Sequence, residues 1–232
     1  MKRQVDLEEI SDGRLYSAND LVKADCGGCA GCSACCRGMG ESIVLDPLDV
    51  HRISIGLKKD FRTLLEKEFE LHVVDGIILP SIKMIGEDEC CAFLDEEGRC
   101  RIHLLRPGIC RLFPLGRYYE DGTFRYFLQV HECIKGNRAK IKVKKWIDTP
   151  DLKAYEKFVL DWHCFLEELD ENLSASGDYE KRRESCMYVL KNFYLQPYER
   201  KQNFYPLFDE RLKQAREDLG LSGDSAKEEV KD

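Results

Sequence analysis

The amino-acid sequence predicts an α+β protein: a small cysteine-rich, metal-stapled module of short β-hairpins and helices, followed by a helical C-terminal segment. Two observations favour this fold class. Asp-Gly pairs stand between apolar runs in the first 145 residues, which is a strong local signal for a hairpin. Beyond that point, aromatic and aliphatic residues recur at the three- and four-residue spacing of amphipathic helices.

The first third of the chain is expected to contain an extension and two helices. Residues 1–24 are polar with a weak helical pattern, and we expect them to form an N-terminal extension packed on the module. Asp46 and Pro47 are residue types typical of a helix N-cap and first turn, so they predict a helix that ends near Gly56. Residues 60–69 predict a second helix from the spacing of their apolar side chains.

Three hairpins are predicted in the middle of the chain. The Asp-Gly pairs at 75–76 and 121–122 each join two apolar runs. Residues 91–103 are expected to fold back on themselves at 95–98, with one cysteine on each arm. These hairpins and the cysteine loops belong to one predicted metal-chelating domain, residues 25–147.

The C-terminal segment, residues 148–220, is expected to form three helices packed on that domain. Thr149 and Pro150 have the residue types of an N-cap and N1 pair, and a clear amphipathic pattern follows them. Residues 179–194 and 205–219 predict the second and third helices, with Gly220 able to close the last one. Residues 221–232 are expected to be a frayed tail.

The composition argues against several classes of partner. The chain has 36 basic and 43 acidic residues, a net charge of −7, so no general attraction to nucleic acid or an anionic membrane is expected. No apolar run has the length of a membrane span. The N-terminus is too polar for a secretory signal, which predicts a cytoplasmic location. We therefore expect the partner or substrate to be another protein, whose identity the sequence does not give.

Twelve cysteines are the most informative residues in the chain. In a reducing compartment they indicate metal ligands or redox centres rather than disulfides. Five lie between residues 26 and 36, and four between residues 90 and 110. The Cys-x2-Cys-x2-Cys-Cys run from Cys29 to Cys36 favours a [4Fe–4S] cluster over zinc. Its adjacent final pair can serve two centres or form a reversible disulfide, which leaves a thiol redox protein as one hypothesis.

The spaced motifs resemble the CxxCxxCC, or YkgJ-type, family. The run is followed by Cys91-x-Phe-Leu, Cys100-Arg-Ile-His, Arg106-Pro-x-x-Cys110-Arg-x-Phe-Pro and a later Cys133. That family is described as a zinc- or iron-chelating cysteine-cluster domain, so the resemblance implies a metal-binding protein, with either an iron–sulfur cluster or zinc and with a redox role as one use. The eight implied ligands are Cys29, Cys32, Cys35, Cys36, Cys91, Cys100, Cys110 and Cys133.

An enzymatic alternative comes from the same resemblance. The family includes a flagellin lysine N-methylase, which implies an S-adenosylmethionine-dependent methyltransferase acting on protein lysine. The sequence itself contains no strand–GxGxxG–helix unit, so no motif adds support for a nucleotide loop. Whether the chain is an enzyme is left open, and no catalytic residue is assigned.

Arginines and further cysteines surround the motif positions. Eight thiolates carry a large negative charge, and Arg106 and Arg111 are expected to offset it from behind the ligands and so contribute to cofactor binding. His103 and His131 lie near motif cysteines but are not needed as ligands. The roles of the other four cysteines are not fixed by the pattern: Cys26 as a substitute ligand, Cys90 as a bystander, and Cys164 and Cys186 as small core residues.

Overall fold

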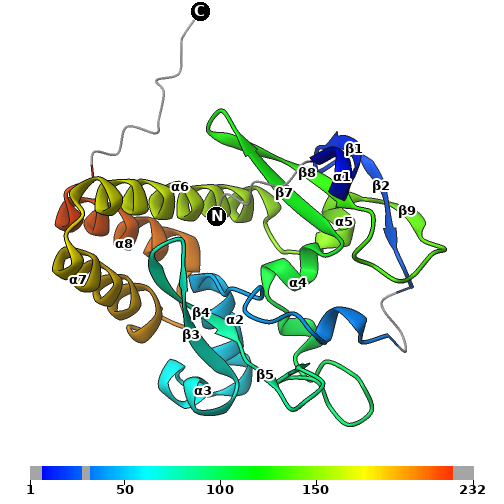
Figure 1. Cartoon of the computed structure of the whole chain (residues 1–232), viewed down its shortest axis with the longest axis horizontal. Helices are drawn as coiled ribbons and strands as arrows, with labels where there is room; N and C mark the ends of the chain where they lie inside the picture. Colours follow the sequence, from blue (N-terminus) through cyan, green and yellow to red (C-terminus); the bar gives the residue numbers. More distant parts are fainter. Residues whose placement is uncertain (1–6, 28–31, 222–232) are drawn as a thin grey trace, which may run out of the picture.

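A computed structural model describes residues 7–27 and 32–221 of the chain. It combines helices with small antiparallel sheets and has a helical C-terminal region, which confirms the α+β fold class (Figure 1). Cys29 and, except for Leu221, the predicted frayed tail lie outside the described residues. None of the described helices is both long enough and apolar enough to cross a membrane.

The strands pair in one three-stranded and three two-stranded antiparallel sheets within the described residues. The larger sheet has the order β1-β8-β7, and the pairs are β2-β9, β3-β4 and β5-β6. Their bounds are β1 Ser11–Tyr16, β2 Leu21–Asp25, β3 Phe69–Val74, β4 Ile77–Ile82, β5 Met84–Ile85, β6 Cys90–Cys91, β7 Leu115–Glu120, β8 Thr123–Gln129 and β9 Ala139–Lys142.

The N-terminal segment is mainly sheet, so the weak helical pattern expected there was wrong for most of the described part. Only α1, Leu7–Ile10, is helical. β1 pairs with β8, and β2 pairs with β9. Val22 and Ala24 are fully buried while their neighbours in β2 face outward, which is the period-two burial of a strand. Because both partner strands lie more than 90 residues later, local sequence could not reveal this pairing.

Two of the predicted hairpins are confirmed and the third is only partly formed. The turns between β3 and β4 and between β7 and β8 are the predicted Asp-Gly pairs, with positive φ at both residues of each turn. Residues 91–103 make a turn at 95–98, but only one bridge, Leu94 to Cys100, joins the two arms. Cys91 pairs instead with Met84, because β5 competes for the same edge.

The helices largely follow the predicted pattern. Asp46 caps α2 as expected, and Gly220 closes the last helix at a φ of 64°. The cap predicted at Thr149 was wrong, because Asp151 accepts a hydrogen bond from the Ala154 N–H and starts the long helix there. The helices are α2 Pro47–Leu57, α3 Phe61–Lys67, α4 Gly108–Leu112, α5 Val143–Ile147, α6 Leu152–Ser176, α7 Tyr179–Val189 and α8 Phe204–Leu219, with short turns η1 Ala34–Cys36 and η2 His103–Leu105 and a π-helical turn, η3 Leu190–Leu195.

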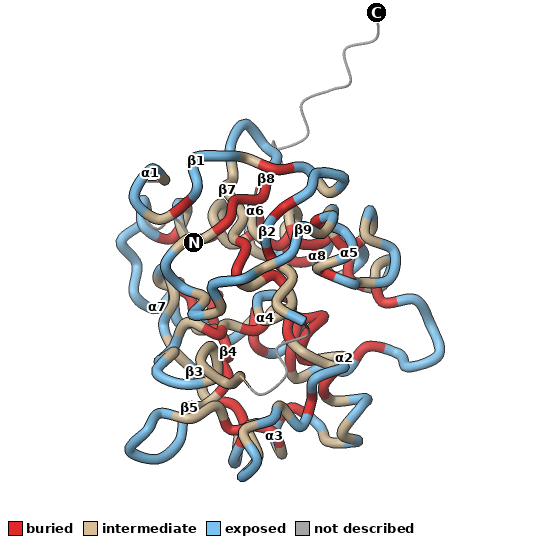
Figure 2. The backbone as a smooth tube through the Cα atoms, turned by 90° about the vertical axis from the view of Figure 1, so that its right-hand side faces the viewer, coloured by how far each residue is buried: buried red, intermediate tan, exposed pale blue. Residues whose placement is uncertain are grey.

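An aromatic core joins the C-terminal helices to one another and to the sheets. The Phe158 and Phe208 rings meet edge to face with centroids 4.6 Å apart, and Trp162 and Phe193 pack beside them. The Tyr194 hydroxyl donates to the Leu45 carbonyl over 3.0 Å, which ties η3 to the segment before α2. The buried residues form one connected cluster, and Figure 2 shows them running through the interior.

Candidate metal centre

The segment from Cys26 to Cys36, which we call the cysteine loop, follows β2, and the residues just after it contact β6. The Cys36 N–H donates to the Ser33 carbonyl over 2.9 Å, which closes the single turn of η1. Just after this turn, Arg37 forms a β-bridge with Cys90, and the Gly38 N–H donates to the Glu89 backbone carbonyl over 3.0 Å. These contacts hold the end of the loop next to the strand that carries Cys91.

Four thiols from four separate segments lie within electrostatic reach of one another. We call them the inner thiol group, which consists of Cys35 in η1, Cys91 in β6, Cys100 after the turn at 95–98, and Cys110 in α4. Burial raises the pKa of Cys110, and Asp49, Cys91, Cys35 and Cys100 raise it further. Burial also raises the pKa values of Cys91 and Cys100, and Cys35 adds to both shifts.

The Cys35 thiol also has a partner in the neighbouring residue. A hydrogen bond with Cys36, followed by burial, raises the pKa of Cys35. Since all four inner thiols have raised pKa values, they are protonated at neutral pH in the metal-free protein. Metal ligation requires thiolates, so these groups would have to lose their protons to bind a metal.

Two arginines lie beside the inner thiol group. Arg106 lowers the pKa of Cys35 and of Cys100, and Arg101 lowers the pKa of Cys91 and of Cys100. Larger causes raise these pKa values: the hydrogen bond with Cys36, followed by burial, at Cys35, and burial at Cys91 and Cys100. The Arg101 guanidinium also donates to the Ala92 carbonyl over 2.8 Å. Both arginines are therefore placed to stabilise thiolates once these have formed.

Arg111 has a different position. Its guanidinium donates to the carbonyls of Arg106 and Asp148, each over 3.1 Å, and also to the Leu104 carbonyl. It holds the loop around η2 against the end of α5. Burial, followed by nearby Arg52 and Arg106, lowers its pKa. Arg111 contacts backbone oxygens, whereas Arg101 and Arg106 are close enough to lower the pKa values of the inner thiols.

A second set of thiols lines a small cavity. We call it the outer thiol group: Cys26, Cys32 and Cys133, which share the cavity with Cys35. Its volume is about 20 Å³, enough for one particle the size of a water molecule. Phe113, Pro114 and Trp146 form the apolar part of its wall. The sequence signal for Cys26 was its spacing, which extends the Cys-x2-Cys array by one step.

The remaining cysteines and histidines lie elsewhere. The Cys90 sulfur accepts a hydrogen bond from the Arg37 guanidinium over 2.7 Å. Cys164 is on α6, and Cys186 is buried on α7 with its thiol 3.7 Å from the Gly76 carbonyl, so neither joins the inner or the outer group. His103 and His131 are exposed. Within the described residues, no three His, Cys, Asp or Glu side chains are close enough together to hold one metal ion.

A buried carboxyl pair supports the helix that carries Cys110. Asp46 and Asp49 form a reciprocal capping box at the start of α2, with the Asp49 N–H 2.8 Å from Asp46 Oδ1. Asp49 also makes a long-range hydrogen bond, in which its Oδ1 accepts the Gly108 N–H over 2.8 Å. Burial raises the pKa of both carboxyls. Sequence reasoning identified Asp46 but missed Asp49, although an acidic residue three positions after an N-cap is a capping-box signal.

Comparison with known proteins gives one match. Residues 28–133 match the family model CxxCxxCC, described as "Putative zinc- or iron-chelating domain". The matched range begins after Cys26 and ends at Cys133, so it contains all eight motif cysteines. Neither the curated proteins nor the solved structures gave a match, and nothing found here links the chain to a flagellin methylase.

Proposed function

We propose that this chain is a metal-binding protein whose inner thiol group holds an iron–sulfur cluster, of the [4Fe–4S] type, or a zinc ion. The observation that supports the proposal best is that four segments, far apart in sequence, each bring one thiol into reach of the other three. Four thiolates are the full ligand set of a [4Fe–4S] cluster and of a structural zinc site. The matched zinc- or iron-chelating domain supports the same function.

The donor chemistry fits such a centre, and the arrangement indicates how it would be loaded. The inner thiols are near one another but not within coordination distance, so binding would draw η1, β6 and α4 together. Arg101 and Arg106 would then lie next to four thiolates and offset their charge. Because the thiols start protonated, loading would release protons and weaken in acid.

The other four motif cysteines are proposed as a second ligand set. Cys32 is in the outer thiol group with Cys133, and Cys36 is next to the inner group. Cys29 is assigned from the sequence motif alone. A cluster at either set would supply one-electron transfer, whereas zinc would supply structural support without redox chemistry.

The test is a metal analysis of protein purified without oxygen. Iron, zinc and acid-labile sulfide are measured per chain, together with the visible absorption spectrum. Iron with matching sulfide and visible absorbance identifies a cluster, and zinc without absorbance identifies a zinc site. Less than one equivalent of either metal per chain would overturn the proposal.

Matched variants test the ligand assignment. Cys110→Ser removes an inner thiol, and we expect it to lose bound metal and to become sensitive to protease, because the cysteine loops contain too little apolar sequence to fold alone. Cys164→Ser is the control, since this thiol on α6 belongs to neither group. Equal metal content in the two variants would show that Cys110 is not a ligand.

A further inference from the structure

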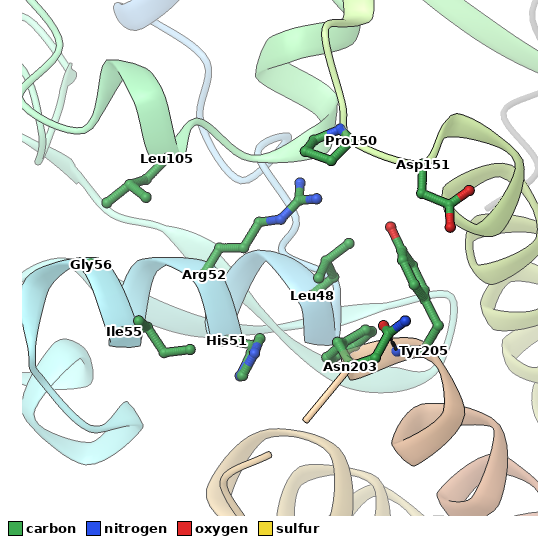
Figure 3. A pocket seen from close by; sticks show the side chains of 11 residues that line it. Leu48, His51, Arg52, Ile55, Gly56, Leu105, Pro150, Asp151, Asn203 and Tyr205 are labelled. Carbon is green, nitrogen blue, oxygen red and sulfur yellow. Dashed lines mark hydrogen bonds between the residues drawn. The ribbon is translucent and has the colours of Figure 1, made fainter. Parts of the chain in front are cut away.

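A larger pocket lies between α2, η2 and the start of α8, and none of the residues lining it is a cysteine. Its volume is about 450 Å³, within the range of small-molecule sites. Leu105, Ile55 and Gly56 line one end. Figure 3 shows Tyr205 and Asp151 at the other end, with Arg52 between the two. The pocket therefore has an apolar end and a charged end.

Arg52 provides the positive charge. Its guanidinium donates to the Thr149 hydroxyl over 3.3 Å, and no described carboxylate lies within ion-pair distance of it. Burial, followed by Arg52, Arg211 and Arg200, lowers the pKa of nearby His51. His51 is therefore neutral at pH 7, and Arg52, which also lowers the pKa of the buried carboxyls Asp46 and Asp49, is the cationic group that lines the pocket.

Tyr205 provides a hydroxyl without a partner. Its oxygen is buried and has no hydrogen-bond partner, a situation that carries a free-energy cost unless a ligand completes it. Figure 3 shows this hydroxyl directed toward the side of the pocket where Asp151 lies. Arg52 and Asp151 both act on Tyr205, with opposite effects on its pKa, so the three groups are neighbours.

Asp151 determines what else the ligand must carry. One of its oxygens caps α6 by accepting the Ala154 N–H over 3.2 Å, and the side chain is exposed at the pocket wall. A simple anion bound at Arg52 would be repelled by this carboxylate. A ligand with an ammonium group next to its carboxylate would satisfy both residues.

We propose that this pocket binds a zwitterionic α-amino acid with an apolar side chain. Its carboxylate would pair with Arg52, its ammonium group with Asp151, and the Tyr205 hydroxyl would donate to the carboxylate. Its side chain would lie against Ile55 and Leu105. The proposal goes beyond metal binding and does not depend on which metal the thiols hold.

The experiment is an NMR titration of the full-length protein with L-phenylalanine and two analogues. Phenylalaninamide lacks the carboxylate, and 3-phenylpropionate lacks the ammonium group. We expect phenylalanine to bind tightest, with each analogue about tenfold or more weaker, which is the usual effect of losing a charged hydrogen bond. Failure of phenylalanine to give saturable shifts, or equal binding of all three compounds, would overturn the proposal.

Variants assign each charge to its residue. Arg52→Gln should lose the preference for phenylalanine over phenylalaninamide, and Asp151→Asn should lose the preference over 3-phenylpropionate while retaining the helix cap. Arg62→Gln, an exposed position on α3, is the control and should behave as wild type. Unchanged preferences in the first two variants would refute the assignment. Their amide spectra, recorded before ligand is added, show whether they are folded.

Tyr205→Phe provides a second readout that does not depend on ligand charge. Removing an unpartnered buried hydroxyl should leave the free energy of unfolding unchanged or raise it, while phenylalanine binding weakens several-fold. A loss of stability without a change in affinity would show that the hydroxyl has a structural partner instead.

Discussion

Asp49→Ala tests how the fold supports the helix that carries Cys110. In the structure, Asp49 does two things: it completes the capping box of α2, and it accepts the Gly108 N–H at the start of α4. The substitution removes both contacts. The Gly108 N–H is buried, so it would be left without a partner.

The expected loss follows from these two contacts. An unpaired buried N–H costs about 1–3 kcal/mol, and loss of the capping interaction adds about 1 kcal/mol. Burial raises the pKa of Asp49, which means that the charged carboxylate is less stable in the folded protein than in water. Removing the carboxylate therefore offsets part of the lost free energy of unfolding. We therefore expect the free energy of unfolding to fall by about 2–3 kcal/mol.

Urea unfolding measures this loss, and Asp60→Ala is the matched control. Asp60 caps α3 by accepting the Thr63 N–H over 2.8 Å and makes no long-range hydrogen bond among the described residues. It should cost about 1 kcal/mol. Asp49→Ala should also lower metal content, whereas Asp60→Ala should not. If the two variants lose equal stability, the contact between Asp49 and Gly108 does not contribute as argued.

Two further predictions concern Phe208 on α8 and His51 on α2. Phe208→Ala should lower the free energy of unfolding by about 3–5 kcal/mol, because Phe208 is fully buried against Phe158; a loss below about 1 kcal/mol in urea unfolding would contradict this packing. Burial, followed by Arg52, Arg211 and Arg200, lowers the pKa of His51 in the folded protein. As the pH falls, the unfolded chain therefore protonates His51 at a higher pH than the folded protein does. The free energy of unfolding should fall as the pH drops below 6.5, the ordinary pKa of histidine. His51→Gln should reduce this fall in unfolding experiments at constant metal content; an unchanged pH dependence would exclude His51 as a source.

Features set by neighbouring residues were predictable from the sequence. The two Asp-Gly turns, the Asp46 cap and the Gly220 helix end each depend on a few adjacent residues. The strand at 21–25 was not predictable in this way, because its partner β9 lies more than 100 residues away. That pairing is next to the cysteine loop, which is why Cys26 shares a cavity with Cys133.

The two candidate sites also differ in how far they could be predicted from neighbouring residues. Cysteine spacing predicted a metal centre, since few other functions require so many thiols in so short a stretch, and residues 28–133 match a zinc- or iron-chelating family model. The larger pocket has no such spacing, because its residues come from α2, η2, the start of α6 and α8. Arg52 is an ordinary helix residue by sequence. Only the fold shows that no described carboxylate pairs with it.

The two proposed sites share a segment, and this makes their coupling measurable. Leu105 lines the apolar end of the pocket and lies in η2, between the inner thiols Cys100 and Cys110. Metal bound by these thiols would fix both ends of that segment and hold Leu105 against Gly56 of α2. We therefore expect phenylalanine to bind more tightly to metal-loaded than to metal-free protein, by about fivefold or more.

Linkage requires the reverse effect as well, so phenylalanine should raise metal affinity by the same factor. The measurement is a pair of titrations, phenylalanine into both forms and a competing chelator with and without phenylalanine. A matched change in both would show that the segment from Cys100 to Cys110 connects the sites. Equal phenylalanine affinity in the two forms would show that the pocket is already organised without metal, most directly through the contact between Asp49 and Gly108.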